Sequence, residues 1–220
     1  MALSSDDVRF SKRLTYVLRH GAVSLKLPIS ADGYVPLSAI FAMRDFKKFA
    51  LADLERVVAL DSKQRFSLDM NDADSSQWRI RANQGHSIPV VLDTELLTPV
   101  RADEAIGLIC IHGTYLRHWE AIFHQGLCRM KRNHIHFAAG DVGANEVISG
   151  MRTSVQLKIY VDVAKVLADG IPFYRSANNV LLCPGVGEKG LLSRRYFSKV
   201  VRVQDAAVLY TPAMDMDDDA

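Results

Sequence analysis

The chain has 220 residues, of which 49% are hydrophobic and 24% charged, a composition typical of folded globular proteins. No apolar run approaches the roughly 20 residues of a membrane-spanning helix, and the N-terminus lacks the basic and apolar pattern of a secretory signal. The net charge of +2 hides an asymmetry, because the last eight residues hold four aspartates and no cation. The rest of the chain therefore carries +6, which favours a polyanionic partner.

The three cysteines lie far apart in the sequence and form no C-x-x-C pair. They indicate reduced thiols and hence an intracellular protein, in the cytoplasm or the nucleus. We expect no membrane partner, and nothing in the sequence requires more than a monomer.

The first 90 residues predict three helices followed by a β-hairpin. Ser5-Asp6-Asp7 can cap the first helix. The predicted segments are a helix from about residue 8, a helix that begins after Pro36, a helix over 51–60, and strands over 65–70 and 77–81. This order is typical of a winged helix, a nucleic-acid-binding variant of the helix-turn-helix.

The second half predicts more strand than helix. Its predicted segments are strands over 108–112, 155–161 and 180–183, and a helix over 116–125 that Gly126 ends. It has neither the G-x-G-x-x-G turn of a dinucleotide-binding sheet nor a P-loop. We predict an α+β protein with an N-terminal lobe over 1–90, a linker over 91–100, a β-rich lobe over 101–210 and a disordered acidic tail over 211–220.

The segment from Ile80 to Ser87 combines a fixed cation, two amides, a glycine, an imidazole and a hydroxyl within eight residues. Arg81 can form a fork of hydrogen bonds to phosphate oxygens, and Gly85 allows the backbone to approach a ligand. Arg79 lies on the same face of the predicted strand, where an arginine is usually solvated. The segment predicts a polar site for an anion.

Other polar clusters can be interpreted as ordinary structure, and three of them also as ligand contacts. Leu18-Arg19-His20-Gly21 is typical of an ordinary helix C-terminus. His112-Gly113-Thr114 directly follows a predicted strand, where either a ligand-binding turn or a structural turn occurs. The segment 149–152 places an arginine beside a glycine, as an anion contact or a surface cation. Phe173 to Asn178 can pack over a base or a ribose, or form an ordinary loop.

Metal binding is not favoured by the sequence. His134 and His136 face one side of a predicted strand, but no carboxylate or cysteine follows at metal-ligand spacing. No Ser/His/Asp order or pair of catalytic carboxylates stands out either. Any catalysis would therefore depend on arginine and histidine, which suits a substrate that brings its own nucleophile.

Taken together, these segments resemble the NAD-dependent RNA 2′-phosphotransferase family (Tpt1/KptA). The resemblance covers roughly residues 10 to 200. The matching segments are Leu18 to Gly21, Asp32-Gly33-Tyr34-Val35-Pro36, Lys63 to Phe66, Ile80 to Ser87, His112 to Thr114, His134 to His136, Ile148 to Arg152, Asp169 to Phe173 and Arg175 to Asn178.

The resemblance implies a winged-helix RNA lobe followed by an ADP-ribosyltransferase-like lobe that holds NAD. It implies removal of the 2′-phosphate that tRNA ligation leaves at a splice junction. The RNA 2′-phosphate attacks C1″ of the nicotinamide ribose and expels nicotinamide. The ribose 2″-hydroxyl then attacks the phosphorus, which releases RNA with a 2′-hydroxyl and ADP-ribose 1″,2″-cyclic phosphate. NAD is consumed as a co-substrate.

The resemblance also assigns residues. The catalytic set of the family corresponds to Arg19, His20, Arg81 and Arg152, whose three guanidinium groups are expected to meet around one RNA phosphoryl group. The residues assigned to NAD are His112, Gly113, Thr114, His136, Ser149, Phe173, Arg175, Ser176 and Asn178. No metal ligand is assigned.

Two alternatives remain open at the level of sequence. The first is an ADP-ribosyltransferase that caps terminal phosphates of nucleic acid and stops after the first step. The second is a winged-helix regulator that binds NAD without catalysis, which the presence of all four catalytic positions disfavours.

Overall fold

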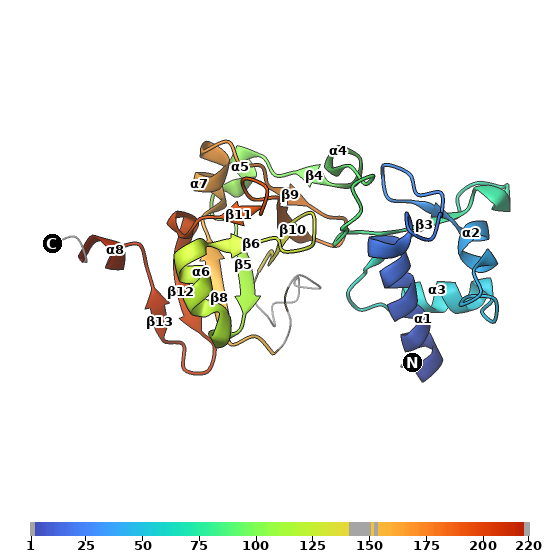
Figure 1. Ribbon diagram of the computed structural model, residues 1–220, viewed down its shortest axis with the longest axis horizontal. Coiled ribbons are helices and arrows are strands. Elements are labelled where there is room, and N and C mark those ends of the chain that lie inside the picture. Colours follow the sequence, from blue (N-terminus) through green and yellow to red (C-terminus); the bar gives the residue numbers. More distant parts are fainter. Residues whose placement is uncertain (1–2, 141–150, 152–153, 218–220) are drawn as a thin grey trace. The chain divides into compact units, whose positions relative to one another are not determined.

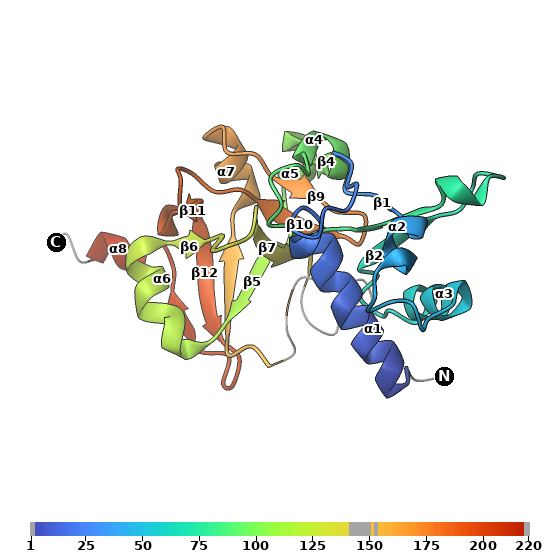
Figure 2. The ribbon, with the colours of Figure 1, turned by 45° about the vertical axis from the view of Figure 1, so that its right-hand side comes forward.

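The structure, a computed structural model, describes residues 3–140, 151 and 154–217. The chain divides into two compact units, Met1–Leu97 (unit 1) and Thr98–Ala220 (unit 2). Both units contain helices and strands (Figures 1 and 2), which confirms the α+β class. Every helix among the described residues is too short or too polar to traverse a bilayer.

Unit 1 contains the predicted helices and hairpin together with short additional elements. These are α1 (Ser5–Tyr16), the π-helical turn η1 (Val17–Gly21), β1 (Val35–Pro36), α2 (Leu37–Ala42), α3 (Leu51–Ala59), β2 (Phe66–Asp69), the 3-10 turn η2 (Ser75–Gln77), β3 (Arg79–Ala82) and α4 (Asp93–Leu96). The strands pair antiparallel in the order β1-β3-β2. The hairpin therefore gains a third strand that the sequence did not predict, since β1 has two residues and no alternation to detect.

Helix α1 begins because Ser4 and Asp7 form a reciprocal cap. The Ser4 hydroxyl accepts from the Asp7 amide at 3.1 Å, and the Ser4 amide donates to the Asp7 carboxylate at 3.0 Å. The cap lies one residue before the predicted Ser5-Asp6-Asp7. The apolar face of α1 then packs Phe10 and Leu14 into the core of unit 1.

Strand β3 separates the core of unit 1 from a polar surface. Ile80 and Ala82 are fully buried, whereas Arg79 and Arg81 point to the other face and are half-buried. The predicted period-2 pattern is therefore confirmed, and both arginines lie on one side of the sheet.

Unit 2 is built on a sheet with the strand order β13-β12-β8-β5-β7-β10-β9-β4, in which all pairs are antiparallel. A separate pair joins β11 and β6. The elements are β4 (Thr98–Pro99), α5 (Ala102–Ala105), β5 (Ile111–Thr114), η3 (Leu116–His118), α6 (Trp119–Gln125), β6 (Leu127–Cys128), β7 (Ile135–Ala138), β8 (Leu157–Val161), α7 (Val163–Ala168), β9 (Tyr174–Arg175), β10 (Val180–Cys183), β11 (Leu191–Leu192), η4 (Arg194–Tyr196), β12 (Phe197–Arg202), β13 (Val208–Tyr210) and α8 (Met214–Asp217).

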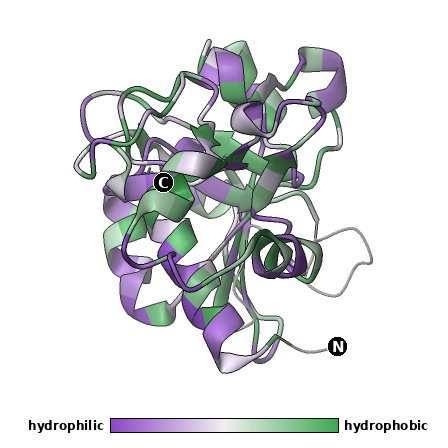
Figure 3. Cartoon of the chain, turned by 90° about the vertical axis from the view of Figure 1, so that its right-hand side faces the viewer, coloured by the Kyte–Doolittle hydropathy of each residue, from purple (hydrophilic) through white to green (hydrophobic). Residues whose placement is uncertain are grey.

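The core of unit 2 lies on the central strands. Phe137, Ile159 and Leu181 are fully buried there, and α7 adds Val166. In Figure 3 the helices change between purple and green from residue to residue, as expected of amphipathic helices that cover a core.

Most predicted segments of unit 2 match these elements, with three differences. The strand predicted over 155–161 is β8, which begins at Leu157. Strand β5 begins at Ile111 and not at residue 108, so the apolar residues 108–110 precede the ladder. The segment 211–220, predicted to be disordered, contains the short helix α8. The helical segment over 116–125 is confirmed as η3 and α6, and Gly126 follows it with φ of 85°, a left-handed value that suits glycine.

Candidate active site

Arg19 and His20 lie in a π-helical turn. Helix α1 does not end at Tyr16 but widens into η1, which runs to Gly21. Val17 and Leu18 remain buried, while Arg19 is half-buried and His20 exposed. Single π-helical turns inside α-helices occur often at functional sites. Here the turn presents two adjacent polar side chains directly after two buried apolar residues, Val17 and Leu18.

The segment 85–87 holds this turn in place. The Ser87 amide donates to the Arg19 carbonyl at 2.9 Å, and Nδ1 of His20 lies 2.9 Å from the Ser87 hydroxyl oxygen. At Gly85, φ is +87°, and an added Cβ would lie 3.3 Å from Cζ of Arg19. A side chain at residue 85 would be strained and would crowd the Arg19 guanidinium.

Arg81 lies on β3, which contacts η1. Its Nη1 donates to the Asp32 carbonyl at 3.1 Å, and its Cζ lies 4.6 Å from the centre of the Tyr34 ring. Its buried Nε has no hydrogen-bond partner among the described residues. A buried donor without an acceptor is costly, so this guanidinium is suited to receive a ligand oxygen.

Arg79 shares the Tyr34 ring but differs in charge balance. Its Cζ lies 4.3 Å from the ring centre, and its Nε donates to the Asp69 carboxylate at 3.0 Å. Its Nη1 lies 3.8 Å from Oδ2 of Asp32. In contrast, no carboxylate of the described residues forms an ion pair with Arg81. The charge of Arg79 is therefore compensated internally, whereas that of Arg81 is left for an anion.

Buried polar residues follow Arg81 in the sequence. Asn83 and His86 are only 4% and 3% exposed. The Asn83 amide group donates to the Gln64 carbonyl at 2.8 Å and accepts from the Ser67 hydroxyl at 2.5 Å. Most of the polar segment 80–87 is therefore buried. Within this segment only Arg81 and Ser87 are partly exposed.

Arg152 and Ser149 lie outside the described residues. In the described part of the chain, the catalytic assignments therefore concern Arg19, His20 and Arg81, which all belong to unit 1.

In unit 2, His112 on β5 and His136 on β7 are linked through backbone carbonyls. Nδ1 of His112 lies 3.0 Å from the His136 carbonyl oxygen, and Nδ1 of His136 lies 3.0 Å from that of His134. Because a carbonyl only accepts, Nδ1 carries the proton in both rings. Nε2 of neutral His112 is then an acceptor, suited to a ribose hydroxyl. Burial lowers the pKa of His112, and the Arg132 charge adds to this.

This shift gives a testable pH dependence of stability. The unfolded chain binds a proton at residue 112 near pH 6.5, whereas the folded chain binds it only at lower pH. The free energy of unfolding should therefore decrease as the pH falls below 6.5, and His112→Gln should reduce that decrease. Urea unfolding at a series of pH values measures both. His118→Gln removes an exposed histidine of the same unit as a control, and an equal change in the two variants would contradict the prediction.

Gly113 and Thr114 complete the end of β5. An added Cβ on Gly113 would lie 2.4 Å from Cγ of Met151 and 2.7 Å from Cγ1 of Val155, so the position requires glycine unless these side chains move. Thr114 is 7% exposed. The backbone of this strand end is therefore closely covered by the side chains of Met151 and Val155.

The predicted residues around β9 and β10 serve mainly in packing and in a turn. The Phe173 ring is 1% exposed and packs 5.3 Å from the Phe137 ring, so it belongs to the core and has no free face for a ligand. The Ser176 hydroxyl donates to Asn178 at 2.8 Å and accepts from the Val180 amide at 3.0 Å. Arg175 donates to Asn179 at 2.5 Å.

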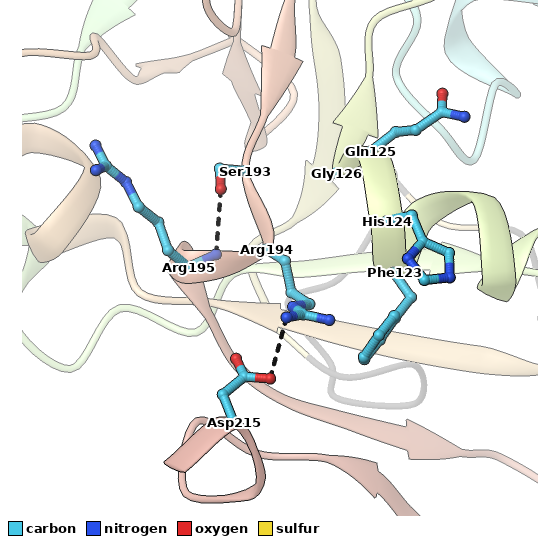
Figure 4. A pocket seen from close by; sticks show the side chains of 8 residues that line it. All are labelled: Phe123, His124, Gln125, Gly126, Ser193, Arg194, Arg195 and Asp215. Atoms are coloured by element: carbon cyan, nitrogen blue, oxygen red, sulfur yellow. Dashed lines mark hydrogen bonds and ion pairs between the residues drawn. The ribbon is translucent and has the colours of Figure 1, made fainter. Parts of the chain in front are cut away.

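The residues that sequence reasoning did not assign are Asp32, Tyr34 and Ser87. Each lay in a segment that the resemblance singled out, but only three-dimensional contacts reveal its partner. A pocket of about 300 Å³ in unit 2 was also missed, and it contains none of the predicted residues (Figure 4). Its lining is Phe123, His124, Gln125, Gly126, Ser193, Arg194, Arg195 and Asp215.

Comparisons with known proteins agree with the resemblance. Residues 5–185 match the model of the family described as RNA 2′-phosphotransferase, Tpt1 / KptA family. The tRNA 2′-phosphotransferase 1 of Danio rerio is 46% identical over 200 residues, which cover 91% of this chain and 88% of that protein. The human protein of the same name is 43% identical, with 90% and 77% covered.

A more distant relative gives the same result. The tRNA 2′-phosphotransferase of Saccharomyces cerevisiae is 37% identical over 185 residues, with 82% of this chain and 80% of that protein covered. Both the extent of the family match and these identities are high, and the chain therefore belongs to the Tpt1/KptA family of RNA 2′-phosphotransferases.

Proposed function

We propose that this protein is an NAD-dependent tRNA 2′-phosphotransferase. It would remove the splice-junction 2′-phosphate from ligated tRNA and yield RNA with a 2′-hydroxyl, nicotinamide and ADP-ribose 1″,2″-cyclic phosphate. The names of the relatives support the phosphate transfer. The structural observation that carries the proposal is the arrangement of Arg81, Arg19 and His20, which the segment 81–87 supports together.

The proposed roles in unit 1 follow from charge. A 2′-phosphate dianion needs fixed cations that hold it in line for transfer, and positioning accounts for much of the barrier. Arg81 suits this role because, within the described part of the chain, no carboxylate compensates its charge and its Nε has no hydrogen-bond partner. Arg19 would add a second guanidinium, and both would offset charge that develops on the phosphoryl oxygens. Arg152 would add a third.

His20 would orient the substrate or move a proton. An imidazole is the side chain that exchanges protons most readily near neutral pH. The Ser87 hydroxyl at Nδ1 fixes the orientation of the ring. Which atom of this pair donates depends on the tautomer.

NAD would supply the ribose carbon that accepts the phosphate and the hydroxyl that completes the transfer. The residues of unit 2 fit such a ligand in part. His112 is neutral near pH 7 with Nε2 as an acceptor, and Gly113 and Thr114 lie beside it at the strand end. His136, Arg175, Ser176, Asn178 and Ser149 remain proposed contacts, whereas Phe173 would act only through the core.

The proposal extends to architecture. Unit 1 would be a winged-helix RNA lobe, supported by its helices and small antiparallel sheet. Unit 2 would be an ADP-ribosyltransferase-like NAD lobe. The three free cysteines support a protein that acts inside the cell, and we propose a monomer.

One experiment separates the possible activities. The protein is incubated with NAD and an RNA that carries one internal 2′-phosphate, and the products are identified by mass. Full turnover yields the cyclic phosphate and supports the proposal. RNA that keeps an ADP-ribose would identify a capping ADP-ribosyltransferase, and a lack of nicotinamide release would indicate a non-catalytic protein.

Ser87→Ala should lower the turnover rate by up to about tenfold, since one hydrogen bond of this kind contributes about 0.5–1.5 kcal/mol. The expected loss arises because His20 is no longer oriented. Single-turnover rates with the 2′-phosphorylated RNA measure it, and Ser87→Thr should restore most of the rate. In a His20→Ala background the Ser87→Ala change should have no further effect, and an additive loss would show that Ser87 acts otherwise.

A further inference from the structure

Arg194 lines the pocket of about 300 Å³ in unit 2. Its Cζ lies 3.8 Å from the centre of the Phe123 ring and 5.4 Å from that of Tyr210. The two aromatic rings hold the guanidinium in place, so little conformational freedom is lost when it binds an anion.

Arg194 and Tyr210 both contact one carboxylate of the same chain, that of Asp215. Nη2 of Arg194 lies 3.1 Å from Oδ1 of Asp215, and the Tyr210 hydroxyl donates to Oδ2 at 2.6 Å. Burial and the Asp215 carboxylate raise the pKa of Tyr210 to about 12, so this phenol is a donor at neutral pH. Two donors thus converge on the two oxygens of one carboxylate. Figure 4 shows the ion pair of Arg194 with Asp215.

The neighbouring arginine does not take part. Nη2 of Arg195 donates to Asp169 at 2.9 Å and to the Tyr196 hydroxyl at 2.5 Å. In Figure 4 its side chain extends away from Arg194 and Asp215. Of the two adjacent cations, only Arg194 is directed at the pocket anion.

Asp215 is a weak occupant. Its side chain is 39% exposed and belongs to the four-residue helix α8, and exposed ion pairs contribute little. A phosphate group brings more charge and more acceptor oxygens, and it matches the guanidinium fork. His124 and Ser193 also line the pocket.

We propose that the Arg194–Tyr210 pair is a phosphate-binding site, and that Asp215 of the acidic C-terminal segment occupies it until a phosphate group displaces it. None of the predicted catalytic and NAD residues lines this pocket. Arg194, Tyr210 and Asp215 also lie outside residues 5–185, which match the family model. The phosphate belongs either to an RNA backbone or to a free phosphate compound.

The test measures binding to the full-length protein. Inorganic phosphate is titrated at constant ionic strength and neutral pH, with the melting temperature as readout, and a short single-stranded RNA without a 2′-phosphate is titrated by fluorescence anisotropy. Asp215→Asn should tighten binding by up to about fivefold, the equilibrium equivalent of an exposed ion pair. Arg194→Gln in that background should abolish the gain.

Matched variants separate the site from general charge effects. Asp205→Asn makes the same charge change and releases Arg202, which lies within 3.1 Å of that carboxylate. Arg195→Gln removes the neighbouring cation. Neither should reproduce the effects at 215 and 194. A response to RNA identifies a backbone phosphate, and a response to inorganic phosphate alone identifies a free one.

The proposal is overturned if Asp215→Asn binds neither ligand more tightly than Asp205→Asn does, or if Arg194→Gln and Arg195→Gln behave alike. Because neither titration requires NAD or a 2′-phosphate, this outcome is independent of the proposed enzymatic activity.

Discussion

Arg81→Ala is expected to lower the rate of 2′-phosphate removal by about 10²–10³, the usual loss when one charge-stabilising donor is removed from an active site. The guanidinium is held by the Asp32 carbonyl and the Tyr34 ring, and no described carboxylate neutralises it. Single-turnover assays with saturating NAD and 2′-phosphorylated RNA measure the chemical step. The free energy of unfolding should change little, because Ile80 and Ala82 on the opposite face carry the packing.

Arg79→Ala is the matched control. It removes the same side chain from the same strand face and the same Tyr34 ring, but this guanidinium is paired with Asp69. We expect a much smaller loss of rate than at residue 81. Equal losses in the two variants would mean that general positive charge on this face, and not a specific phosphate contact of Arg81, supports activity.

Phe137→Ala should lower the free energy of unfolding by about 3–5 kcal/mol, the range for truncation of a buried phenylalanine. The ring is fully buried in the middle of the unit 2 sheet and packs against Phe173 at 5.3 Å and the His112 ring at 5.9 Å. Urea unfolding measures the loss. Because His112 rests on this ring, NAD affinity should also weaken at temperatures where the variant remains folded.

Phe137→Leu separates the two effects. It preserves most of the buried volume and should cost less unfolding free energy than the alanine variant. If NAD affinity falls in proportion to the free energy of unfolding in both variants, the Phe137 ring affects NAD binding only by stabilising the fold. Unchanged NAD affinity in the folded alanine variant would remove His112 from the proposed site.

The sequence predicted those elements whose signal is local. Strand β3 alternates strictly, and α6 ends at a glycine with a left-handed φ, so both were predicted correctly. The cap of α1 was displaced by one residue because Ser4 and Ser5 are chemically equivalent candidates. The start of β5 was placed too early, since an apolar run does not reveal where strand pairing begins.

The candidate site was predictable as a set of residues but not as an arrangement. Resemblance pointed to Arg19, His20 and Arg81, yet no local pattern shows that Ser87 contacts His20 or that Tyr34 stacks on two arginines. These contacts join residues far apart in the sequence. Phe173 illustrates the converse, because its place in a motif did not reveal that its ring is enclosed in the core.

Because Arg19 and His20 lie in the π-helical turn η1, their directions depend on the number of residues in the first helix. A π turn holds one residue more than the α-helical geometry around it. Deleting a single residue from 17–21 would remove this extra residue, return the backbone to regular winding and change the directions of the side chains within the turn. Arg19 and His20 would then face elsewhere while Phe10 and Leu14 kept their packing. This segment should therefore tolerate substitution at exposed positions far better than insertion or deletion.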